Sequence, residues 1–216
     1  MTRLTVSEQT ERPRALALAV SGVVLLWLGY ATLQTLSTLG ILGEGLYAAV
    51  SFVPGLLGVG ILLWSGCSCE SCFLQVRRPS KAGLAVLAGV MLFALAAILP
   101  AGTWQGWDWT AALVYAPASG VSQELFFRSA LLPAMLTLWK KRPILGVVAH
   151  SALFGLWHIG PLFLGAPLWA VAAVMAVPFV SGLGWAWAVR HDKTVLWAMV
   201  QHSLIWVIGL QFAFEA

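Results

Sequence analysis

Apolar residues fill seven segments of this chain, and short polar stretches separate them. The segments cover residues 15–38, 46–65, 82–101, 110–139, 143–162, 167–189 and 194–213. Each is near or above the roughly 20 residues that a helix needs to cross a bilayer. The pattern therefore predicts an all-α integral membrane protein of about seven transmembrane helices. Residues 1–14 are polar and mixed in charge, so they are expected to form a short tail.

Composition agrees with a membrane protein. The chain is 60% hydrophobic and only 9% charged, whereas charged residues make up about a quarter of an ordinary soluble domain. A soluble domain of 216 residues could not hide this much apolar surface. The first apolar segment is longer than the roughly 7–15 residues of a signal-peptide core, so we expect it to remain in the mature protein. We predict one membrane domain over residues 15–213.

Basic residues lie in alternate connections between the segments. Eleven of the twelve Lys and Arg residues precede the first segment or separate segments two and three, four and five, or six and seven. The loops on the other side carry Glu44 and Asp108 but no base. Cytoplasmic loops accumulate Lys and Arg, so the N-terminal tail is predicted inside and the C-terminus outside, in a multi-pass protein of the plasma membrane. The net charge of +4 then reflects topology and not nucleic-acid binding.

Two clusters flank the predicted spans. The first surrounds an outer loop and consists of Trp104, Trp107 and Trp109. Aromatic rings favour the membrane interface, so we interpret them as anchors. The second follows the second span and consists of Cys67, Cys69 and Cys72. Their C-x-C-x-x-C spacing suits a thiophilic metal, but a fourth ligand is missing, and a structural or incidental role is expected.

Ionisable side chains inside the apolar segments mark the predicted functional region. Glu124 and Arg128 lie in the fourth segment, His158 in the fifth and His202 in the seventh. Charged groups at membrane depth are costly and usually face a protein interior or a water-filled cavity. The spacing of four between Glu124 and Arg128 puts both on one face of a helix, where they can form an ion pair.

Counting along the segments estimates the depth of each group. Glu124 and His158 each lie about 15 residues from the inner end of their segment, which is roughly 22 Å deep at 1.5 Å per residue. His202 and His150 come out shallower, at roughly 12 Å. Equal depth on neighbouring antiparallel helices would let Glu124 and His158 share a water molecule. We therefore expect the helices to enclose a polar cavity.

Such a cluster suits water activation. A buried Glu can act as general base and His can assist or donate a proton, while a second His can hydrogen-bond the oxyanion of a tetrahedral intermediate. The same groups also fit a structural ion pair with satisfied histidines, or the proton relay of a small transporter. Glu124, His158 and His202 could instead supply three zinc ligands. Because the chain lacks a local H-E-x-x-H helix, a site without metal or other cofactor is favoured.

Three short motifs in the second half of the chain resemble those of a known family. Residues 123–128 read Q-E-L-F-F-R, residues 154–158 read F-G-L-W-H and residues 202–206 read H-S-L-I-W. Over about residues 110–210 they resemble the E-E-x-x-x-R, F-x-x-x-H and H-x-x-x-N motifs of the CPBP family of intramembrane proteases. That family includes CAAX prenyl endopeptidases and bacteriocin-processing or self-immunity proteins.

The resemblance implies a fold, a reaction and a role for each matching residue. It implies a helical membrane fold with a conical cavity that opens to the cytosolic side and to lipid. His158 would activate the attacking water together with the first Glu of the first motif, His202 would contact the oxyanion, and Arg128 would hold the first motif together. The implied partners are membrane lipid and a peptide or protein substrate at the membrane.

Two positions depart from the family pattern. Gln123 stands at the first Glu and cannot act as a base, and Trp206 stands at the Asn and offers only an indole N–H. Glu124 could take over as base through a modest helix rotation, His158 could act while Gln123 positions water, or the chain could have kept the scaffold and lost proteolysis. The leading hypothesis is an intramembrane endopeptidase, and the alternative is a catalytically degenerate scaffold or immunity protein.

Overall fold

The computed structural model describes residues 6–213, and this part of the chain is almost entirely helical, as predicted. The first half forms four α-helices and a single 3₁₀ turn: α1 Val6–Thr38, α2 Glu44–Val50, α3 Phe52–Trp64, α4 Lys81–Ile98 and η1 Leu99–Ala101. Ser80 begins α4 as its N-cap, since its Oγ accepts a hydrogen bond from the Gly83 N–H at 2.9 Å.

The second half begins with one long helical rod and continues with three further helices. The rod consists of the π-helical turn η2 Ala111–Tyr115, α5 Ala116–Phe126, the π-helical turn η3 Phe127–Leu131 and α6 Leu132–Leu138. After it come α7 Pro143–Leu156, the 3₁₀ segment η4 Gly160–Leu164, α8 Leu168–Asp192 and α9 Leu196–Gly209. Two short strands, β1 Thr103–Trp104 and β2 Phe212–Ala213, pair antiparallel beside the C-terminal end of α9.

Five helical stretches within residues 6–213 are long and apolar enough to cross a membrane. They are Arg14–Thr38, Glu44–Trp64, Lys81–Ile98, Pro143–Leu164 and Leu168–Asp192. Five of the seven predicted spans therefore meet the length and composition of a transmembrane helix. The seventh, Leu196–Gly209, is apolar but shorter. The fourth, at 110–139, is divided by its π-helical turns, and its middle part carries the buried polar side chains of the first motif.

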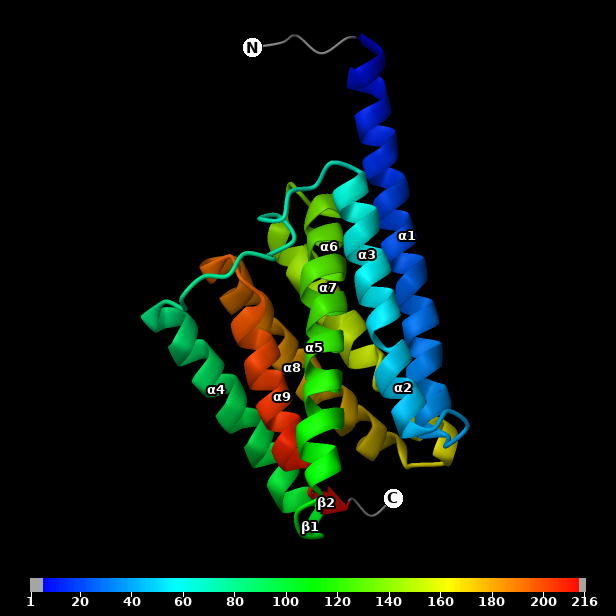
Figure 1. Ribbon diagram of the computed structural model, residues 1–216, viewed down its shortest axis with the longest axis vertical. Coiled ribbons are helices and arrows are strands. Elements are labelled where there is room, and N and C mark those ends of the chain that lie inside the picture. Colours follow the sequence, from blue (N-terminus) through cyan, green and yellow to red (C-terminus); the bar gives the residue numbers. More distant parts are fainter. Residues whose placement is uncertain (1–5, 214–216) are drawn as a thin grey trace.

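The rod of α5 and α6 occupies the middle of the bundle (Figure 1). It packs against α9 and α3, while α4 packs on α8 and α9, and α7 lies between α6 and α8. All five residues of η3 are buried. Because the rod is central, the polar side chains of the first motif are buried inside the protein.

Small residues let the central helices approach closely. A Cβ added at Gly120 on α5 would lie 2.7 Å from the Cα of Ser203 on α9. A Cβ added at Gly155 on α7 would lie 2.7 Å from the Met175 carbonyl oxygen on α8. Small residues are typical of helix interfaces in membrane proteins, where close van der Waals packing drives association. The glycine at position 120 therefore fixes how near the first and third motifs can come.

The connections between helices alternate between the two ends of the bundle (Figure 1). The segments 65–80, 139–142 and 193–195 lie at the upper end of the view, and 39–43, 99–110 and 157–167 lie at the lower end. The basic connections of the sequence thus share one end. At this end the Val195 N–H donates to the Phe73 carbonyl at 2.9 Å, which ties segment 65–80 to the start of α9. Which end faces the cytosol stays a prediction.

The tryptophan cluster is exposed, and the cysteine cluster is exposed only in part. The Trp104 and Trp107 rings lie 5.6 Å apart between centroids, the Trp107 and Trp109 rings stack at 5.7 Å, and all three are about half exposed. This arrangement suits the predicted interfacial anchors. The three cysteines are free thiols, with Cys69 exposed and Cys72 buried. They form no metal-binding group among the described residues.

Candidate functional site in the centre of the bundle

The Glu124 carboxylate lies at the centre of the candidate site and is fully buried. Its Oε1 accepts a hydrogen bond from Nδ1 of His202 at 2.8 Å. Its Oε2 lies 3.2 Å from Nε of Arg128, four residues further along the rod. The ion pair predicted from the spacing of four is therefore present. The contact with His202 joins the first motif directly to the third.

Local helix geometry places these groups. Glu124 lies in the last turn of α5, and Arg128 lies in the π-helical turn η3 that follows. A π-helical turn holds one more residue than an α-helical turn and is often found at functional sites. On the other side, α9 brings His202 against α5 next to the close approach at Gly120. The carboxylate is thus held from its own rod and from a neighbouring helix.

Aromatic rings enclose the Arg128 side chain. Its guanidinium carbon lies 4.4 Å from the centroid of the Phe154 ring and 5.0 Å from that of Trp185. Attraction to the faces of these rings partly compensates a cation that is removed from water. The NH1 and NH2 groups have no hydrogen-bond partner among residues 6–213. Its Nε is close to Glu124, yet the angles are not those of a hydrogen bond. We therefore describe the pair as an ionic contact.

Two tryptophan side chains contact the His202 imidazole in addition to Glu124. It stacks on the Trp185 ring with centroids 4.5 Å apart and 28° between the planes. Its Nε2 accepts a hydrogen bond from the indole Nε1–H of Trp206 at 3.1 Å. Trp185 is itself fixed, because its indole N–H donates to Oε1 of Gln201 at 2.6 Å, and the Gln201 amide donates to the Leu87 carbonyl. These contacts tie α4, α8 and α9 around one imidazole.

His158 lies close to this group but does not contact Glu124. It follows the end of α7 and is half-buried, and its Nδ1 donates to the Phe154 carbonyl at 2.9 Å. The Phe154 ring stands edge-on to the His158 ring at 5.2 Å and to the His202 ring at 6.1 Å. Among the described residues no hydrogen bond joins His158 to Glu124.

The depth estimate was wrong about His202, which hydrogen-bonds to the Glu124 carboxylate, whereas a shared level of Glu124 and His158 stays a prediction. It placed His158 at the level of Glu124 and His202 closer to one end. The count treated helix ends as level, but α6 extends beyond the connection between α8 and α9 (Figure 1). His202 consequently reaches Glu124 only a few residues into α9.

Gln123 and His150 are buried polar residues beside the pair. The Gln123 side chain is 1% exposed, and its Oε1 has no hydrogen-bond partner in the described part of the chain. His150 on α7 is fully buried, and its Nε2 likewise lacks a partner within residues 6–213. On another side of α5, Ser122 accepts a hydrogen bond from Ser51 on the preceding helix pair at 3.0 Å. This serine contact is structural.

Sequence reasoning missed Trp185, Gln201 and the ring of Phe154 as parts of the site. Phe154 was considered only as the first residue of the second motif. Trp185 and Gln201 lie in apolar segments where an aromatic ring or a single amide carries no distinguishing pattern. A signal was available at position 201, because this amide directly precedes His202 inside a predicted span.

The geometry gives no ligand cluster for a metal. Across the described residues, no group of three His, Cys, Asp or Glu side chains is arranged to hold a metal ion. Both nitrogens of His202 already have partners, in Glu124 and Trp206. The zinc alternative that combined Glu124, His158 and His202 stays a prediction without a preformed ligand set.

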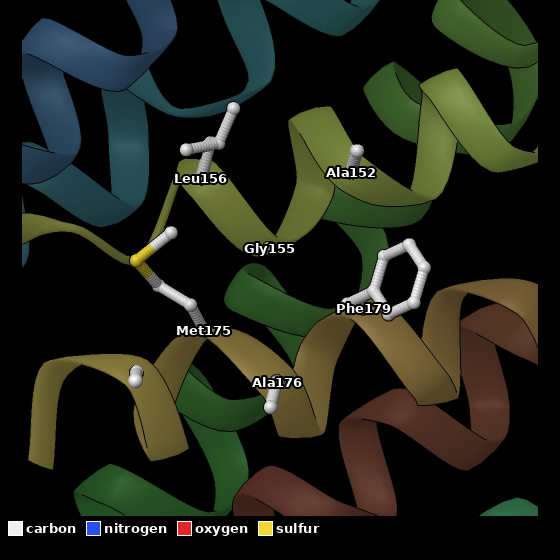
Figure 2. A pocket seen from close by; sticks show the side chains of 7 residues that line it. Ala152, Gly155, Leu156, Met175, Ala176 and Phe179 are labelled. Atoms are coloured by element: carbon white, nitrogen blue, oxygen red, sulfur yellow. The ribbon is translucent and has the colours of Figure 1, made fainter. Parts of the chain in front are cut away.

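An apolar groove lies beside the second motif, between α7 and α8 (Figure 2). It measures about 460 Å³ and is lined by Ala152, Gly155, Leu156, Ala172, Met175, Ala176 and Phe179. In Figure 2 these residues come from the two facing helices. The residues that line the groove include no ionisable group. The polar cavity around Glu124 stays a prediction.

Comparison with known protein families gives a match to the second half of the chain. Residues 104–208 match the family described as Rce1-like, type II CAAX prenyl endopeptidase. The chain carries a CPBP family domain. This domain contains the central rod, α7, α8 and most of α9, and thus Glu124, Arg128, His158 and His202, whereas α4 lies outside it. No curated protein and no solved structure matches the chain. Together with the five long apolar helices, the CPBP domain makes this a multi-pass membrane protein.

Proposed function

We propose that this protein is an intramembrane endopeptidase that hydrolyses peptide bonds of a membrane-associated substrate. The observation that carries the proposal is the buried Glu124 carboxylate, held between Arg128 and His202 inside a CPBP domain. A fully buried charge is costly unless it is paired. Buried ionisable groups at membrane depth usually serve function.

The proposed general base is Oε2 of Glu124, the carboxylate oxygen that has an ionic contact with Arg128 but no hydrogen-bond partner among the described residues. Oε1 is engaged by His202, whereas Oε2 has no hydrogen-bond partner in the described chain. Oε2 therefore has lone pairs that can accept a proton from the attacking water. Arg128 lies beside this carboxylate and pairs with its charge. The water oxygen then bonds to the scissile carbonyl carbon, and Glu124 holds the released proton.

His158 is the proposed second acid–base group. Because its Nδ1–H donates to the Phe154 carbonyl, its Nε2 carries the lone pair of the neutral ring. Nε2 can take up the remaining proton of the added water from the tetrahedral intermediate and deliver it to the nitrogen of the leaving amine as the C–N bond breaks, after which the proton on Glu124 returns to solvent. Its half-buried position makes it more accessible than Glu124, which suits a group that faces the departing product.

Hydrolysis by these residues needs no metal, and we propose a metal-free site. Treatment of the purified protein with a chelator should leave cleavage unchanged. Loss of cleavage that Zn²⁺ restores would instead favour the alternative in which Glu124, His158 and His202 bind zinc. Such binding would require one ring nitrogen of His202 to exchange its present partner, Glu124 or Trp206, for the metal.

The proposal is tested by comparing new N-termini in the membrane proteins of cells. Cells that produce wild type, Glu124→Gln or Glu70→Gln at equal levels are compared by mass spectrometry of N-terminal peptides. Glu70 is a matched control because it is an exposed carboxylate paired with Arg77 outside the spans. We expect a set of cleavage products with wild type and Glu70→Gln that disappears with Glu124→Gln. An identical set in all three strains would contradict the proposal.

A second function is favoured by one observation. Gln123, at the position where the family motif begins with Glu, is buried and has an unpaired side-chain oxygen among the described residues. A carboxamide cannot act as a base, so the chain could serve as a degenerate scaffold or immunity protein. In the same experiment, products that appear only with Gln123→Glu would support this alternative. Products with wild type would support the endopeptidase.

A further inference from the structure

Trp206 stands at the position of the Asn in the family's third motif, and its side chain contacts His202. It lies one helical turn after His202 on α9, and its indole Nε1–H donates to Nε2 of His202 at 3.1 Å. The two rings are nearly parallel, with 25° between their planes. Trp206 is only partly buried, so its side chain is not a filler of the core.

This contact determines where the proton of His202 resides. An indole nitrogen can donate a hydrogen bond but cannot accept one. Nε2 of His202 must therefore present a lone pair to Trp206, and the proton of the neutral ring must lie on Nδ1. Nδ1 is the atom that lies 2.8 Å from Oε1 of Glu124. The hydrogen bonds consequently run in one direction, from Trp206 through His202 to Glu124.

The same arrangement removes His202 from the role of an oxyanion donor. An oxyanion requires an N–H that points towards it. The one N–H of the neutral ring is used by Glu124, and Nε2 has no proton to offer while Trp206 donates to it. Stacking on Trp185 restrains the ring from turning to present a different edge. While Trp206 donates to Nε2, His202 can hold the carboxylate but cannot donate to an oxyanion.

We infer that Trp206 is a positioning residue that commits His202 to Glu124. It fixes the tautomer of the imidazole, and the imidazole orients the carboxylate with its Oε2 free. The catalytic meaning of this inference rests on the proposed function. There it explains how the Glu124 carboxylate is oriented when Gln123 stands at the first Glu of the motif. The hydrogen-bond direction itself is a property of the resting protein and is measurable without any substrate.

The test uses the ¹⁵N resonances of the His202 ring in protein labelled at histidine and reconstituted in lipid nanodiscs. We expect wild type to show a pyrrole-like Nδ1 and a pyridine-like Nε2 whose resonance is shifted by an accepted hydrogen bond. Trp206→Phe keeps a ring but removes the donor, so the Nε2 resonance should lose that shift. Trp206→Asn supplies an amide donor and should restore it in part.

Trp187→Phe is the matched control. Trp187 is partly exposed and stacks on His191 at 4.7 Å between centroids, whereas the ring on His202 is that of Trp185, so loss of Trp187 should change His191 and leave His202 as in wild type. A protonated, pyrrole-like Nε2 in wild type would overturn the inference. So would an Nε2 resonance that is the same in wild type and Trp206→Phe.

Activity gives a second, separate readout. If wild type cleaves, Trp206→Phe should lower kcat by several-fold with KM nearly unchanged, and Trp206→Asn should recover part of kcat. An unchanged kcat in Trp206→Phe would overturn the positioning role. If no variant cleaves while the ¹⁵N result is as expected, the endopeptidase proposal fails and the hydrogen-bond assignment stands.

Discussion

Glu124 and His202 are 78 residues apart in the chain, yet their side chains form a buried hydrogen bond of 2.8 Å. This contact makes the acid of the first motif and the histidine of the third a single unit. Arg128 completes the unit at 3.2 Å. Each member is buried, so the loss of one leaves another without its partner. We therefore expect the stability of the fold and the proposed activity both to be sensitive to these positions.

Removal of the Arg128 charge should be strongly destabilising. In Arg128→Met the Glu124 carboxylate would remain buried without its ionic partner, which we expect to lower the free energy of unfolding by about 3–5 kcal/mol. The matched control is Arg77→Met, because Arg77 pairs with Glu70 at 3.5 Å at the exposed surface. We expect that change to cost about 0–1 kcal/mol. Unfolding of the detergent-solubilised proteins measures both, and equal losses would contradict the account.

The close approach of α5 and α9 should tolerate no side chain at position 120. Gly120→Ala places a methyl group against the backbone of Ser203, which must move away. Overpacking of this kind costs about 1–3 kcal/mol, and it should also lengthen the Glu124–His202 contact and lower cleavage.

Gly89→Ala is the control for this change. Gly89 lies inside α4, and a Cβ there would meet nothing within 4 Å. Since Ala is a better helix former than Gly by about 1 kcal/mol, this variant should be as stable as wild type or more so. A Gly120→Ala variant that is as stable and active as Gly89→Ala would show that the helices are not held by this contact.

Much of the site could be predicted from sequence because its groups are unusual in their surroundings. Charged residues within apolar segments are rare, so Glu124 and Arg128 were identified as a pair from their spacing alone. The histidines were identified for the same reason. Their order in space was not predictable, because counting from segment ends assumes helices of equal height. The π-helical turns of the central rod also have no hydropathy pattern, and they divide the segment that was read as one long span.

The aromatic rings around Arg128 and His202 could not be predicted from the sequence, for a different reason. Trp185 and Phe154 contact Arg128 and His202 through their ring faces and edges. Rings of this kind are common in membrane helices, and nothing in the sequence separates these two from the others. Trp206 was noted as a departure from the family pattern. Its hydrogen bond to His202 depends on ring orientations that only the structure supplies.

Loss of His158 should reduce cleavage without unfolding the protein. His158→Ala removes the proposed proton donor for the leaving amine, and general acid–base groups contribute about 10²–10⁴-fold to rate. His191→Ala serves as control, since His191 is exposed at the end of α8 and stacks on Trp187. Initial rates of peptide cleavage in proteoliposomes provide the comparison. Equal rates for the two variants would rule out a catalytic role for His158.

The predicted orientation is testable with the native thiols. Cys69 is exposed in segment 65–80, whereas burial raises the pKa of the Cys72 thiol to about 11. Because the thiolate is the reactive form, Cys69 should react with a maleimide much faster than Cys72 near neutral pH. With the N-terminus inside, a membrane-impermeant maleimide should label Cys69 only after cells are permeabilised.

The other side of the membrane is checked with Gln105→Cys in a cysteine-free background. Gln105 is exposed in the connection between α4 and the central rod, at the opposite end of the bundle. This variant should be labelled in intact cells. Labelling of Cys69 in intact cells, with no labelling at position 105, would reverse the predicted topology.

The proposal that Glu124 activates water for peptide hydrolysis is tested most directly with purified protein in proteoliposomes. The substrate is a membrane-anchored peptide identified from the cellular cleavage products, and the rate of its cleavage is measured. Wild type, Glu124→Gln and Glu70→Gln are compared in ¹⁸O-labelled water. The account predicts that wild type and Glu70→Gln cleave at similar rates and place one ¹⁸O atom in the new carboxyl group. It predicts that Glu124→Gln is slower by about 10²-fold or more. Cleavage by Glu124→Gln at the wild-type rate would contradict it.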